Sequence, residues 1–220
     1  MNDEKGDLST DEELSDAELC EHQLLSLLTP PEPEKMRIIG LYGDIEEEMS
    51  ANAIYGMQSL LHEGKRQTLS NPEDPNSELI TTFDPFEMYI STWGGVAMNM
   101  FAVYDCMRLI RQKCDIHTVG LGKVMSAGVL LLAAGTKGKR KIGANCRVMI
   151  HSVIGGHEGS LHNLENEMEE IRWIQNQHIK ALISETDMTT AQLKKILSRK
   201  MNVYLDAEEA VELGIADEII

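Results

Sequence analysis

The spacing of apolar residues from Lys35 to the C-terminus restricts the fold more than any other feature of the sequence. β-rich runs alternate with stretches whose apolar residues recur at helical spacing. The pattern predicts strands at 36–42, 87–91, 116–121 and 146–151, and helices at 46–62, 98–109, 127–134 and 160–184. Strands and helices that alternate at these lengths indicate an α/β protein whose strands pair in parallel.

Two segments of this region are unusual in length. The predicted helix 160–184 carries an apolar stripe on one face, formed by Leu161, Leu164, Met168, Ile171, Ile174 and Leu182. This stripe must be covered either by the core of the same chain or by a second subunit. The segment 63–86 contains three prolines and many turn-forming residues, so we predict that it is a long surface loop.

The first residues have a different composition. Residues 1–35 hold 11 Asp or Glu and 2 Lys, and Pro30, Pro31 and Pro33 follow a short leucine run. A segment with so much charge and so few large apolar residues cannot offset the entropy lost on ordering. We therefore predict a flexible acidic tail at 1–34 and one folded domain at 35–220.

Charge and cysteine content exclude several classes of protein. A formal net charge of -16 argues against binding to nucleic acid or to anionic lipid. No apolar run approaches the ~18 residues of a membrane span, and the N-terminus does not resemble a signal peptide. The four cysteines form no CxxC pair, and the histidines show no HxH or HExxH spacing. We expect a cytoplasmic protein with free thiols, no metal site and no cofactor.

Three local features could carry chemistry, and each also has a purely structural interpretation. Gly94-Gly95 follows a predicted strand, where paired glycines either make a turn or bring main-chain N–H groups close to a ligand. Ser126 begins a buried helix, so it is either an N-cap or a nucleophile near the positive end of the helix dipole. His151 ends an apolar strand and is either structural or a general base. Together they could supply a nucleophile, a base and an oxyanion hole.

Several longer strings resemble one family. They are YISTWGG at 89–95, AVYD at 102–105, MSAG at 125–128, LLAAGTKGKR at 131–140, NCRVMIH at 145–151, YLDAEEA at 204–210 and LGIAD at 213–217. On these strings, residues 36–220 resemble the proteolytic subunit of the Clp protease (ClpP, serine peptidase family S14). The resemblance implies the ClpP/crotonase fold, a spiral of ββα units with a protruding long helix called the handle.

The resemblance also implies an activity. The protein would be a serine endopeptidase that hydrolyses unfolded polypeptides inside stacked heptameric rings, with entry controlled by an AAA+ unfoldase of the ClpX, ClpA or ClpC type. Ser126 would be the nucleophile and His151 the general base. The backbone N–H groups of Gly95 and Ala127 would form the oxyanion hole, with Gly94 supporting the loop.

Two departures from the family pattern concern the reaction itself. The family's Ser-Pro-Gly-Gly reads Thr92-Trp93-Gly94-Gly95 here. The position of the family's catalytic aspartate, counted back from Tyr204, is occupied by Asn202. An amide carbonyl can hold the histidine tautomer but does not stabilise the imidazolium, and an Asp→Asn change in a serine protease costs about 10⁴ in kcat.

Two other functions therefore stay open beside an active peptidase. The chain could be a weakly active or inactive structural subunit of mixed rings. It could also be a crotonase-type enzyme that acts on an acyl-CoA, because the implied fold is shared. Acyl-CoA chemistry of that kind usually relies on carboxylates, and it leaves Ser126 and His151 without a role.

Overall fold

The computed structural model describes residues 36–74, 76–198 and 201–220. The expected acidic tail at 1–34 lies outside the described residues. Within the described part, no helix is both long and apolar enough to cross a membrane. Cys106, Cys114 and Cys146 are buried free thiols in this part of the chain.

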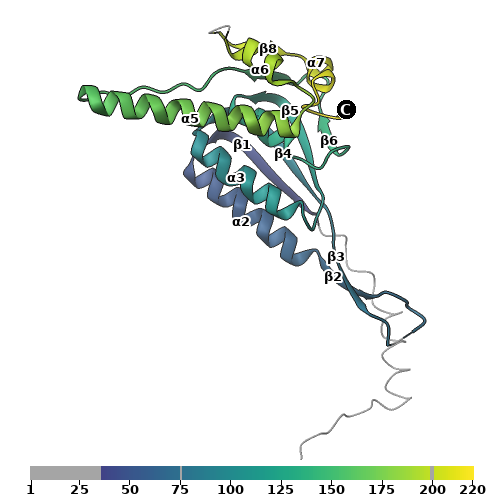
Figure 1. Ribbon diagram of the computed structural model, residues 1–220. Helices are drawn as coiled ribbons and strands as arrows, with labels where there is room; N and C mark the ends of the chain where they lie inside the picture. The colour runs from purple at the N-terminus through teal and green to yellow at the C-terminus, as the bar shows by residue number, and fades with distance from the viewer. Residues whose placement is uncertain (1–35, 75, 199–200) are drawn as a thin grey trace, which may run out of the picture. The chain divides into compact units, whose positions relative to one another are not determined.

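The centre of the domain is a seven-stranded sheet (Figure 1). Its strands are β1 (Ile38–Ile45), β4 (Phe86–Gly95), β5 (Ile116–Met125), β6 (Arg140–Ile142), β7 (Arg147–Ile150), β8 (Val203–Leu205) and β9 (Glu218–Ile219). The order is β1-β4-β5-β6-β9, and β7 pairs with both β5 and β8. All of these pairs are parallel except β7 with β8. The predicted α/β class with mostly parallel pairing is confirmed.

Strand β5 divides its pairing between two neighbours. Its first half pairs with β6 at 118–120, and its last part pairs with β7 at 123–125. Between them lies Gly122, whose φ of +66° favours glycine. Because of this division, the end of β5 lies beside β7 rather than β6.

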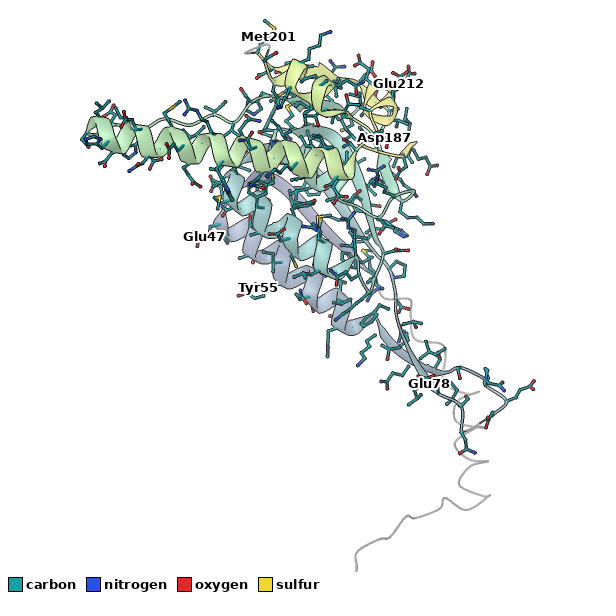
Figure 2. The ribbon with its side chains drawn as sticks, in the orientation of Figure 1. Glu47, Tyr55, Glu78, Asp187, Met201 and Glu212 are labelled. Carbon is teal, nitrogen blue, oxygen red and sulfur yellow. The ribbon has the colours of Figure 1, made fainter. Side chains whose placement is uncertain are left out.

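Three helices account for much of the core. They are α2 (Glu47–Glu63), α3 (Ala97–Ile110) and α4 (Ala127–Ala133). Each buries an apolar face, and α4 is buried along its whole length because every residue in it is small or apolar. Helices α2 and α3 lie side by side in Figure 1, and Tyr55, labelled in Figure 2, points away from the core.

The segment 63–86 is not a structureless loop as expected. It contains strands β2 (Lys65–Leu69) and β3 (Leu79–Phe83), which pair in antiparallel register to form a hairpin. Pro72 lies in the connection and Pro85 follows β3, so neither interrupts a strand. The prediction of surface exposure holds for most of its side chains, and Figure 2 shows Glu78 far from the sheet.

The C-terminal part begins with the longest helix, α5 (Leu161–Glu185), as the apolar stripe predicts. Its buried residues all lie between His178 and Glu185, whereas Leu161 and Met168 are exposed. The first half of α5 extends beyond the sheet in Figure 1. Two short helices follow, α6 (Thr190–Leu197) and α7 (Ala207–Glu212), which the sequence pattern did not indicate.

Candidate active site

Ser126 lies in the turn between β5 and α4 with a strained backbone. Its φ of 54° makes it the one described residue other than glycine with a positive φ. Such a conformation costs about 1–3 kcal/mol and is common at active sites. Ser126 occupies the N-cap position of α4, but its side chain makes no capping hydrogen bond to the helix, so the hydroxyl is available for another role.

His151 follows directly after β7 and meets this serine. The parallel register Val124↔Val148 and Met125↔Met149 brings the ends of β5 and β7 together. His151 Nε2 lies 2.7 Å from Ser126 Oγ. With its ring proton on Nδ1, a neutral histidine can accept the serine proton at Nε2. Burial lowers the pKa of His151, which favours this neutral form at neutral pH.

The two glycines at the end of β4 allow close approach of the backbone. A Cβ on Gly94 would lie 2.6 Å from the Ser126 Cβ, and one on Gly95 would lie 2.4 Å from the Ile45 carbonyl oxygen. The Gly94 N–H donates to Thr92 Oγ1 over 3.0 Å, which holds this strand end. Gly94 therefore lies against the serine and Gly95 against the backbone of β1, and a side chain at either position would clash.

A cavity of about 650 Å³ joins these groups. Ser126, His151, Gly95 and Ala127 all line it. Its apolar lining comes from α3, from α5 and from the segment after His151, through Met98, Met100, Val153, Ile154, Ile171 and Ile174. A cavity lined by apolar side chains next to a serine–histidine pair is suited to binding a peptide for acyl transfer.

The family model for the Clp protease matches residues 78–220. This chain belongs to the Clp protease family. The matched range includes the glycines, Ser126, His151 and Asn202, and the family is one of peptidases. The resemblance to ClpP-type S14 peptidases stated from the sequence is confirmed.

Asn202 is exposed in this Clp protease domain, immediately before β8. The β7–β8 ladder ends at Ile150↔Val203, so the next residues along the two strands are His151 and Asn202. No hydrogen bond joins their side chains in the described structure. The assignment of Asn202 as the third member of a triad stays a prediction.

Among the cavity residues that the sequence did not assign to the site, Trp93 and His178 are the most informative. Trp93 was noted only as a departure from the family pattern, yet it lines the cavity. His178 on α5 also lines it and is buried, and its Nε2 has no hydrogen-bond partner among the described residues. The sequence could have pointed to His178 through its spacing, because it lies four residues after Ile174 and so on the same face of the predicted helix.

Burial, together with the nearby His151, lowers the pKa of His178 to about 4. The ring is therefore uncharged at neutral pH, which suits an otherwise apolar wall. Among the described residues, no group of three or more His, Cys, Asp or Glu is arranged to hold a metal ion.

Proposed function

We propose that this chain is the proteolytic subunit of a Clp-type protease, a serine endopeptidase that cleaves unfolded polypeptides inside a ring-shaped chamber. The 2.7 Å contact between Ser126 Oγ and His151 Nε2 is the observation that carries the proposal. The strained backbone of Ser126 and the peptide-sized cavity support it.

The proposed reaction has two halves. Ser126 Oγ attacks the peptide carbonyl carbon while His151 Nε2 takes the hydroxyl proton. The N–H groups of Gly95 and Ala127 stabilise the oxyanion. His151 then passes the proton to the leaving amine. In the second half, His151 takes a proton from water, the water oxygen attacks the acyl-enzyme carbonyl, and His151 returns the proton to Ser126 Oγ as the acid product leaves. Asn202 would orient His151 through its amide oxygen.

The proposed assembly is a pair of stacked heptameric rings, of this chain alone or mixed with related subunits. The exposed apolar residues on the first half of α5 support this proposal, because Leu161 and Met168 are not covered by any other described part of the chain. The helix would then serve as the handle of the ββα spiral. An AAA+ unfoldase of the ClpX, ClpA or ClpC type would deliver substrates in the cytoplasm, and hydrolysis would need no cofactor.

A second function is favoured by the environment of Asn202. It is exposed, and the described structure has no hydrogen bond from it to His151. Without a third group to hold the ring, His151 would be a weaker base. The chain would then be a weakly active or inactive structural subunit of a mixed ring.

Labelling with a fluorophosphonate probe separates the two functions. An active peptidase is expected to be modified on Ser126 and to hydrolyse a short fluorogenic peptide, and Ser126→Ala is expected to lose both properties. His151→Ala should lower the labelling rate by at least about 10²-fold, because general-base catalysis contributes this much. If the parent protein is folded but neither labelled nor active, the peptidase proposal is wrong and the structural role is favoured.

A further inference from the structure

Trp93 is a large aromatic side chain that is exposed beside the serine–histidine pair. Its exposed fraction is 61%, and it lines the same cavity as Ser126 and His151. The next residue, Gly94, packs so closely on Ser126 that a Cβ there would clash with the serine Cβ. The backbone of Trp93 is thus one peptide unit away from a residue in contact with the nucleophile.

The indole is held in place from the neighbouring strand. The parallel register Thr92↔Val124 puts Trp93 and Lys123 on the same face of the sheet, opposite the buried side chain of Thr92 and two positions apart along the adjacent strands. The Lys123 ammonium lies 5.0 Å from the centre of the Trp93 ring. A cation at this distance is attracted to the ring face, which restricts the rotation of the side chain.

Backbone contacts fix the strand beneath it. Thr92 is buried, and its hydroxyl donates to the Gly43 carbonyl while accepting from the Gly94 N–H. A rigid backbone, a restrained side chain and a mostly exposed ring are the properties of an aromatic contact surface that needs little ordering when a ligand binds.

We propose that Trp93 forms a side-chain subsite next to the scissile bond, which binds an aromatic side chain of the peptide. Lys123 acts as its positioning residue. The proposal rests on the proposed peptidase function and adds a specificity to it. Trp93 on β4 lines the same cavity as Ile171 and Ile174 on α5, so this subsite is one part of that cavity.

The charges near Trp93 are of both signs, since Lys123 lies at its ring and Asp44, Glu46 and Glu167 line the same cavity. The proposed preference for an aromatic side chain therefore rests on the Trp93 ring rather than on these charges. Stacked or edge-to-face aromatic pairs bind about fivefold more tightly than contact area alone would give, which separates aromatic from aliphatic side chains.

The test uses the full-length chain with Ser126→Ala and Trp173→Phe, so that Trp93 is the remaining one of the two tryptophans. Two labelled peptides, identical except for phenylalanine or cyclohexylalanine at one position near the scissile bond, are titrated and followed by anisotropy. The substituted position is scanned along the peptide. The expected result is about fivefold tighter binding of the phenylalanine peptide at one position, with a change in Trp93 emission.

Three variants complete the test. Trp93→Leu is expected to remove the preference, Trp93→Phe to retain part of it, and Lys123→Gln to alter the emission of Trp93 in the free protein. Equal binding of the two peptides at every position, or no binding of either, overturns the proposal, and so does a preference that survives Trp93→Leu.

Binding to the Ser126→Ala protein requires no hydrolysis. Failure of the peptidase function would appear as an inactive parent protein whose Ser126→Ala variant still prefers phenylalanine. Failure of the subsite would appear as an active parent protein without this preference.

Discussion

At the scale of single residues, the backbone of Ser126 opposes stability. A φ of 54° is disfavoured for a residue with a Cβ, whereas glycine adopts positive φ freely. The fold holds Ser126 in this conformation through the hydrogen bond from its N–H to the Met149 carbonyl, 2.8 Å long. Ser126 therefore lowers the stability of the fold, while its hydroxyl is needed for the proposed reaction.

We predict that Ser126→Gly is more stable than Ser126→Ala by about 1 kcal/mol, although both lose peptide hydrolysis. Glycine relieves the strain, whereas alanine keeps the Cβ and is the matched control. Urea denaturation at fixed protein concentration measures the difference. An alanine variant as stable as the glycine variant would show that the turn is unstrained.

His178 is predicted to make stability depend on pH. Its pKa of about 4 in the folded chain lies below the ordinary value of 6.5, so the unfolded chain binds more protons between these values. The stabilisation is complete above pH 6.5 and is lost as the pH falls toward 4. We expect this group to lower the free energy of unfolding by about 2 kcal/mol between pH 7 and pH 5.

His178→Met should flatten this pH dependence by the same amount in urea denaturation. The control is His162→Met, because His162 is exposed on the first turn of α5. His151 contributes in the same direction, since its pKa is also lowered by burial, so part of the slope persists in His178→Met. An unchanged slope in this variant would contradict the prediction.

Asn202 offers a test of the third catalytic position. We predict that Asn202→Asp raises the rate of peptide hydrolysis, because a carboxylate would hold the His151 Nδ1–H and stabilise the imidazolium. The gain should stay below about 10⁴, the cost of the reverse change in a serine protease. Initial rates of peptide hydrolysis by the parent, Asn202→Asp and Asn202→Ala test this prediction. Equal rates would show that Asn202 is not the third catalytic residue.

At the scale of elements, one buried ion pair joins the C-terminal segments to the sheet. Arg140 on β6 pairs with Asp217, and its guanidinium also donates to the carbonyls of Ala133, Glu185 and Gly214. Burial alone would raise the pKa of Asp217, but its hydrogen bonds with Arg140 and Gly138 lower it. The pair thus links β6 with the ends of α4 and α5 and the turn after α7.

We predict that Asp217→Asn lowers the free energy of unfolding by about 3 kcal/mol, because the Arg140 side chain is only 4% exposed and would lose its counter-charge. Asp105→Asn is the control, since its pair with Arg108 is exposed on both sides, and should change stability by less than about 1 kcal/mol. Equal effects in urea denaturation would show that Arg140 does not depend on this partner.

At the scale of the whole molecule, the first half of α5 presents apolar side chains that the described residues leave exposed. Leu161 is 68% exposed and Met168 is 48% exposed, although both belong to the apolar stripe. Apolar residues gathered on one face of a surface helix are typical of an interface between subunits. This exposure supports the proposed rings.

We predict that the parent protein forms a particle of fourteen subunits and that Leu161→Glu with Met168→Glu produces smaller species. Burying two carboxylates in an apolar interface costs several kcal/mol unless they are paired. Mass photometry over a range of concentrations measures this. Glu170→Gln, on the opposite face of α5, is the control and should keep the parent mass. A parent protein that stays monomeric throughout would contradict the ring proposal.

Local patterns in the sequence determined most of the helices and strands. The apolar stripe was sufficient for α5, and an uninterrupted apolar run was sufficient for α4, because both depend on residues a few positions apart. Pairing partners are not local, which is why the β2–β3 hairpin was predicted as a loop. The short strands β6, β8 and β9 were also not predicted, since each is defined by pairing with a strand distant in the sequence. Helices α6 and α7 were missed although each begins with a local signal, the capping boxes of Thr189 with Gln192 and of Asp206 with Glu209.

The sequence by itself determined the α/β class, the family, and the candidates Ser126, His151 and Gly94-Gly95. Only the tertiary structure decided that Ser126 Oγ and His151 Nε2 lie 2.7 Å apart. It also decided that Trp93 and His178 border the same cavity. The physical reason is that strand register and helix packing set these distances, through the pairing of β5 with β7 and the position of α5 against the sheet.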